Sequence, residues 1–111
     1  GMFETGGATV LPQFIAVLRR VGDAIGRNEG HTNIVGYTDS QPIRTIAYPS
    51  NYALSMARAR AAADVISPYV GAGRITASGE GAQSPVGDNA TEAGRRANRR
   101  VEIQVQEGAA Q

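Results

Sequence analysis

Residues 31–67 read HTNIVGYTDSQPIRTIAYPSNYALSMARARAAADVIS, and this stretch decides the fold. Residues 31–38 have a β-branched centre, which predicts a strand. A loop with two prolines follows. The alanine-rich remainder, which Ser50 or Asn51 can cap, predicts a helix that ends before Pro68. A strand, a loop and a helix in this order are the beginning of an α/β unit.

The segments on either side of this stretch carry patterns of their own. Residues 11–25 place apolar side chains at helical spacing, which predicts an amphipathic helix. Residues 74–78 predict a short strand, and Asn89 opens a short third helix. Residues 100–106 alternate apolar and polar side chains, as in a strand with one buried face. A further short strand can form near Phe3.

The order of these elements predicts a two-layer α/β sandwich, with the two long helices on one side of the sheet. The length of 111 residues is enough for one core and excludes a multidomain enzyme. We therefore expect a single domain over residues 1–111, with an ordered core over about residues 3–106. Gly1 ahead of Met2 suggests that this domain was cut from a longer parent.

The composition excludes several classes of function. The 11 basic residues are all arginine, and with 10 acidic residues they give a net charge of +1, so nucleic acid is not an expected partner. The chain has no Cys and a single His, His31, which argues against metal sites, thiol nucleophiles and a Ser-His triad. We expect no cofactor. No apolar run approaches the roughly 18 residues of a membrane-spanning helix.

One arginine, Arg58, lies on the apolar face of the predicted second helix. At about 100° per residue, Asn51, Ser55 and Arg58 fall within about 60° of one another, in the middle of a wide apolar arc. The guanidinium of an arginine stays protonated in proteins, and burying it without a partner costs several kcal/mol. Arg58 therefore needs an acidic partner. The topology offers Asp39, at the end of the preceding strand.

Two interpretations of this pair stay open on the residues alone. Asp39 and Arg58 can form a closed salt bridge that only joins the sheet to the helix. Alternatively, they can clamp a zwitterion, with Asp39 taking its ammonium group and Arg58 its carboxylate in bidentate geometry.

The same residues carry a resemblance to a known family. Three separated blocks occur in the family's order, and the chain resembles the OmpA C-terminal-like peptidoglycan-binding domain over most of its length. The blocks are Gly36-Tyr37-Thr38-Asp39, Asn51-Tyr-Ala-Leu-Ser-Met-Ala-Arg58-Ala59, and the run from Gly79 and Pro85 through Asp88-Asn89 and Gly94-Arg95 to Asn98-Arg99-Arg100-Val101-Glu102-Ile103. The resemblance implies a βαβαβ-type sandwich with the helices on one face of a mixed sheet. It also implies non-catalytic, non-covalent binding of peptidoglycan through the meso-diaminopimelate of the stem peptide.

The resemblance also implies site residues. By position, Asp39 and Arg58 match the family's two main anchors of diaminopimelate, and Thr38 and Asn51 match flanking positions that contribute backbone or amide hydrogen bonds. The chain departs from the family at Tyr37, where a His is usual.

Arg99 and Arg100 match the family's paired arginines, one of which is expected to line the site while the other is structural. Capping the carboxyl end of the third helix is the alternative role for at least one of them.

The loop between Asp39 and Asn51 is longer than in outer-membrane OmpA proteins. It resembles two inner-membrane branches, the TssL (DotU-type) component of type VI secretion systems and the flagellar stator protein MotB. Residues 41–44, QPIR, and residues 88–91, DNAT, favour TssL. The resemblance then implies an inner-membrane parent with this domain in the periplasm, anchoring a secretion complex to the wall. Expected partners are peptidoglycan and other secretion-complex proteins, and a homodimer stays open.

Two other classes of function compete with wall binding. Asp39 and Glu80 could act as an acid and base pair around a glycan, but nothing in their spacing supports an enzyme. A ligand-free interaction module, with a purely structural Asp39–Arg58 pair, is the second alternative.

Overall fold

A computed structural model describes residues 2–4, 6–43 and 45–106. Within them the chain forms helices and strands in the order expected for an α/β sandwich. These are α1 (Pro12–Gly26), β1 (Thr32–Gly36), α2 (Asn51–Val70), a 3₁₀ turn (Ala72–Arg74), β2 (Ile75–Gly79), α3 (Glu92–Asn98) and β3 (Val101–Val105).

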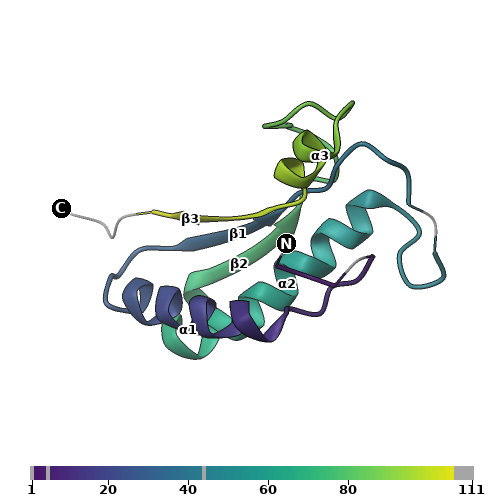
Figure 1. Ribbon diagram of the computed structural model, residues 1–111. Helices are drawn as coiled ribbons and strands as arrows, with labels where there is room; N and C mark the ends of the chain where they lie inside the picture. The colour runs from purple at the N-terminus through teal and green to yellow at the C-terminus, as the bar shows by residue number, and fades with distance from the viewer. Residues whose placement is uncertain (1, 5, 44, 107–111) are drawn as a thin grey trace.

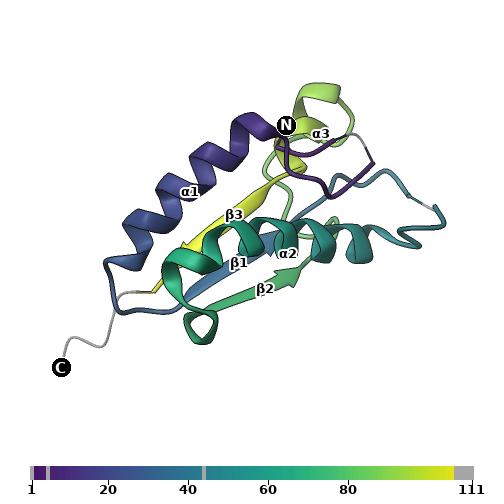
Figure 2. The ribbon, with the colours of Figure 1, turned by 90° about the horizontal axis from the view of Figure 1, so that it is seen from below.

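The three strands form a mixed sheet in the order β2-β1-β3. β1 pairs with β2 in parallel and with β3 antiparallel, so that Gly36 lies between Gly79 and Val101. Figure 1 shows α1 and α2 together on one face of this sheet. Figure 2 shows that α3, the N-terminal segment and the loop after β1 all gather at the end of the sheet where β1 stops. The expected fold class is confirmed.

The core lies between the sheet and the two long helices. Ile34 of β1 and Leu18 of α1 are almost fully buried, and α2 packs against both layers. The face that α2 turns inward consists largely of small side chains, which allow its backbone to approach the strands. The buried residues of α2 are Leu54, Ser55, Arg58, Ala59, Ala62, Ala63, Ile66 and Val70.

Two predicted helix boundaries are wrong. α2 continues through Pro68 to Val70, because a proline in the last turn removes only one backbone hydrogen bond and Val70 is buried in the core. α3 begins after Thr91, whose side chain accepts a hydrogen bond from the Gly94 amide. Asn89 does not cap it, because its side-chain oxygen accepts from the Ser40 amide instead.

Gly36 and Gly79 let α2 approach the ends of two neighbouring strands. A Cβ at Gly36 would overlap the carbonyl oxygen of Ser55, and one at Gly79 would overlap the Ser55 hydroxyl and the Met56 amide. This contact places the first half of α2 directly over the end of β1.

We predict that Gly36→Ala destabilises the domain by about 1–3 kcal/mol, because the added methyl group must push α2 off the sheet. Urea unfolding measures the change. Gly73→Ala is the matched control, since a Cβ at Gly73 meets nothing within 4 Å. Equal unfolding midpoints for the two variants would contradict the close packing of α2 on β1.

Candidate functional site

A pocket of about 670 Å³ opens at the end of the sheet where β1 stops. Four segments contribute to it: the N-terminal segment, the loop after β1, the first half of α2, and α3 with the residue that follows it. The lining residues are Met2, Phe3, Glu4, Gly6, Thr38, Asp39, Gln41, Pro42, Ile43, Leu54, Arg58, Glu92, Arg96 and Arg99.

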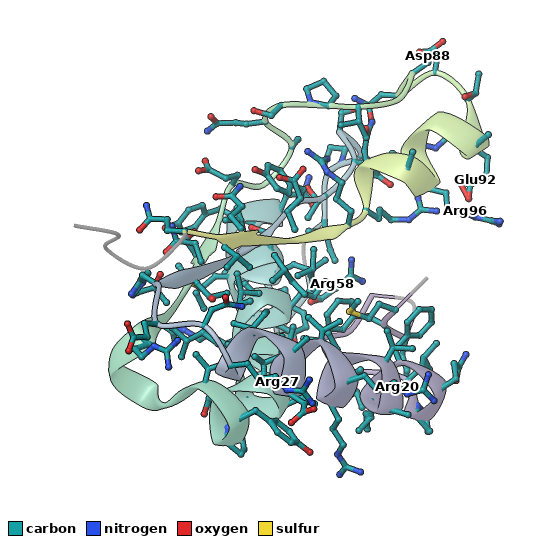
Figure 3. All side chains as sticks on the ribbon, turned by 90° about the vertical axis from the view of Figure 1, so that its left-hand side faces the viewer. Arg20, Arg27, Arg58, Asp88, Glu92 and Arg96 are labelled. Atoms are coloured by element: carbon teal, nitrogen blue, oxygen red, sulfur yellow. The ribbon has the colours of Figure 1, made fainter. Side chains whose placement is uncertain are left out.

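Arg58 lies at the base of this pocket with only 7% of its surface exposed. Its Nε donates to the carbonyl oxygen of Gly7 at 2.8 Å, and its Nη2 reaches that of Glu4 at 3.5 Å. Its guanidinium carbon lies 5.2 Å from the centroid of the Phe3 ring. Figure 3 shows Arg58 in the gap between the sheet and the helical layer, beside the N-terminal segment.

No carboxylate among the described residues forms an ion pair with Arg58. Burial, and after it the positive charge of Arg99, lower the pKa of Arg58 from its ordinary value. Backbone carbonyls and an aromatic ring therefore stabilise this charge only partly, and a carboxylate would stabilise it further.

Asp39 lines the same pocket but pairs with a different arginine. One carboxylate oxygen accepts from the Gln41 amide at 2.9 Å, and the other accepts from Nη1 of Arg99 at 2.7 Å. The register that pairs Gly36 with Val101 brings Arg99 to the end of β1, which is why it reaches Asp39 first. The closed Asp39–Arg58 salt bridge, one of the two open interpretations, is not formed.

Arg99 joins two acids across the pocket. Its Nη2 also donates to Glu92 at 2.9 Å. The hydrogen bond with Glu92, followed by that with Asp39, raises the pKa of Arg99, and the same bond lowers the pKa of Glu92. The three side chains together carry one net negative charge.

Thr38 and Asn51 hold the loop that carries Asp39. The Thr38 hydroxyl donates to the Asp39 carbonyl at 2.9 Å, and Thr38 lines the pocket. The Asn51 amide donates to the Gln41 carbonyl at 2.9 Å and more weakly to that of Asp39. Asn51 does not line the pocket, so its contacts position the loop.

Arg100 points away from the pocket. Its guanidinium carbon lies 3.8 Å from the centroid of the Tyr37 ring, and its Nε pairs with Glu102 at 2.8 Å. It also reaches the carbonyl of Asn98 at the end of α3. Of the paired arginines, Arg99 lines the pocket and Arg100 packs on Tyr37, the residue at which the sequence departs from the usual His.

Phe3, Glu4 and Arg96 line the pocket but were not predicted as site residues. Phe3 and Glu4 belong to a segment that is held by hydrogen bonds from Arg58 and by backbone pairing that includes an isolated antiparallel bridge between Phe3 and Val10. This bridge lies where a short strand was expected, but it does not extend into a strand of the sheet. Arg96 resembles an ordinary exposed residue of a short helix. The apolar side chain of Phe3 in a polar N-terminal stretch was the one available signal.

Two further properties bear on the kind of site. No group of three or more His, Asp or Glu side chains within the described residues could hold a metal ion. None of the helices in that part of the chain is long and apolar enough to cross a membrane.

We predict that Glu92 stabilises the domain at neutral pH and loses this effect in acid. Its folded-state pKa lies below the ordinary 4.5, so the stabilisation is present above the ordinary pKa and disappears as the pH falls through the lowered one. The difference in urea midpoint between the wild type and Glu92→Gln should therefore narrow from about pH 7 to about pH 3. Glu29→Gln is the control, and a pH-independent difference would contradict the Arg99–Glu92 pair.

Several proteins are similar in sequence to this chain. Motility protein B of Bacillus subtilis is 32% identical over 106 residues, which cover 93% of this chain and 41% of that protein. Peptidoglycan-binding protein ArfA of Mycobacterium tuberculosis is 36% identical over 105 residues, which cover 93% of this chain and 31% of that protein. The chain spans less than half the length of these curated relatives.

Solved structures share the fold. The structure of the cell wall anchor of the type VI secretion system (T6SS) from Pseudomonas aeruginosa matches with a TM-score of 0.89 and 42% identity, covering 96% of this chain and 76% of that one. The periplasmic domain of Helicobacter pylori MotB matches with a TM-score of 0.85 and 25% identity, covering 96% of this chain and 69% of that one. The expected likeness to secretion-system anchors and to MotB is confirmed.

The sequence pattern of the OmpA family matches residues 2–99, and the chain belongs to the OmpA family.

Proposed function

We propose that this OmpA-family domain binds cell-wall peptidoglycan without catalysis, through the meso-diaminopimelate of the stem peptide. The observation that carries the proposal is a buried arginine, Arg58, that has no acidic partner among the described residues and lines the same pocket as Asp39. The names of similar proteins support it, because ArfA is a peptidoglycan-binding protein and the secretion-system relative is a cell wall anchor.

The side chains of the pocket suit a ligand that carries both an ammonium group and a carboxylate. A carboxylate offers about four lone-pair positions, and Asp39 uses one on each oxygen, so it can still accept from a ligand ammonium group. No protein partner of Arg58 Nη1 occurs among the described residues, and the Nη2 contact at 3.5 Å is weak. A ligand carboxylate would supply the acid that Arg58 lacks. The volume of about 670 Å³ lies within the usual range for small ligands.

For the longer parent, we propose an inner-membrane protein of a type VI secretion system that anchors its complex to the wall from the periplasm. The identity of 42% with the secretion-system anchor, against 32% with motility protein B of Bacillus subtilis and 25% with the periplasmic domain of Helicobacter pylori MotB, favours this parent over a flagellar stator. Other proteins of the secretion complex are then its proposed partners. A MotB-like stator or an outer-membrane OmpA-type protein is the alternative.

We predict that Asp39→Ala and Arg58→Ala each abolish the pull-down of this domain by purified diaminopimelate-containing sacculi. Each change removes a charge-assisted contact with the ligand worth about 2 kcal/mol, which is roughly thirtyfold in affinity. Circular dichroism checks that both variants remain folded.

Arg60→Ala and Asp64→Ala are the matched controls, since both residues lie exposed on α2 and outside the pocket. Undiminished pull-down of the folded Asp39 and Arg58 variants would leave a ligand-free interaction module as the better interpretation. Release of sugar from the sacculi would instead show an enzyme.

We also predict that the domain discriminates between wall types. Lysine carries the side-chain ammonium group of diaminopimelate but not its second carboxylate, so sacculi with lysine in that position leave Arg58 without its partner. Their binding should fall by at least about tenfold in a co-sedimentation assay. Equal binding of both wall types would refute diaminopimelate recognition while leaving wall binding itself intact.

A further inference from the structure

The remaining arginine of the pocket, Arg96, is exposed on α3 and lines the rim. Within the described residues it has no ion pair and no hydrogen bond through its side chain, in contrast to the other arginines near it. Those are Arg95, which pairs with Glu92, Arg99, which pairs with Asp39 and Glu92, and Arg100, which pairs with Glu102. Figure 3 shows Arg96 beside Glu92 on α3, on the sheet side of the gap in which Arg58 lies.

The pocket therefore holds two cations that its own acids do not neutralise. Asp39 and Glu92 both pair with Arg99, which leaves Arg58 at the base and Arg96 at the rim. The carboxylate of Glu4, also at the rim, forms no ion pair among the described residues. A complementary ligand carries two separate carboxylates and at least one ammonium group.

We propose that the pocket recognises both carboxylates of diaminopimelate. Arg58 binds the side-chain carboxylate, and Arg96 binds the carboxylate in the main chain of the stem. The inference rests on the proposed function and narrows its ligand. Diaminopimelate has two carboxyl groups, and the one in the main chain of the stem is free only where the stem ends at this residue. In a longer stem that carboxyl group becomes a peptide bond and loses its charge. The domain then prefers stems that end in diaminopimelate over longer or amidated ones.

A peptide pair tests this preference directly. One probe is the synthetic tripeptide Ala-γ-Glu-meso-diaminopimelate with its terminal carboxylate free, and the other is the same peptide with that carboxylate amidated. We expect the wild-type domain to bind the free acid about fivefold more tightly by calorimetry, which is the strength of an ion pair at an exposed rim. Raising the salt concentration should reduce the preference.

Substitutions assign the preference to Arg96. Arg96→Gln should bind both peptides with the affinity that the wild type has for the amide, whereas Arg96→Lys should keep part of the preference because it keeps the charge. Arg20→Gln, an exposed arginine of α1 outside the pocket, should behave like the wild type.

Two outcomes overturn the inference in distinguishable ways. The first is equal binding of both peptides by the wild type, or a full preference that Arg96→Gln retains. In either case Arg96 does not bind the main-chain carboxylate, while the proposed wall binding stands. If neither peptide binds the wild type, recognition of diaminopimelate fails and this inference fails with it.

Discussion

The site depends on the environment of the Arg58 guanidinium, which lies inside the domain among backbone carbonyls and an aromatic ring instead of beside an acid. Moving a charge out of water is expensive, and neutral partners repay only part of that cost. A protein whose only requirement was stability would gain from an apolar residue at this position. The charge and the pocket in front of it together point to an anion that arrives from outside.

Arg99 pairs with Asp39, and no described acid forms an ion pair with Arg58. If Asp39 paired with Arg58 directly, the two charges would neutralise each other and leave no electrostatic complement to a zwitterion. Because β3 delivers Arg99 to the end of β1, Asp39 is held at 2.7 Å by a neighbour on the other side of the pocket. Glu92 binds the same arginine and fixes its direction. Asp39 and Arg58 therefore face the same space separately.

The sequence predicted the order of the elements, the fold class and the buried position of Arg58, because these follow from local periodicity and from the cost of burying charge. It did not predict which partner Arg58 finds. The partners are backbone carbonyls of Gly7 and Glu4, and every residue has a carbonyl, so no side-chain pattern marks them. The pairing of Asp39 with Arg99 was missed because it depends on the antiparallel register of β1 and β3, which strand patterns alone do not specify.

The position of the site follows from how closely α2 packs on the strands. Glycine at positions 36 and 79 allows the turn around Ser55 to touch the ends of β1 and β2, where the Ser55 hydroxyl accepts from the Gly81 amide at 3.0 Å. Arg58 lies almost one helical turn further along α2, so the contact that fixes Ser55 also places the backbone of Arg58, while the Gly7 and Glu4 carbonyls orient its guanidinium. The Gly81 carbonyl in turn accepts from the Thr38 amide at 2.7 Å, next to Asp39. This contact between small residues thus places the backbone that carries both charged side chains, and the loop after β1 completes the pocket with Gln41, Pro42 and Ile43.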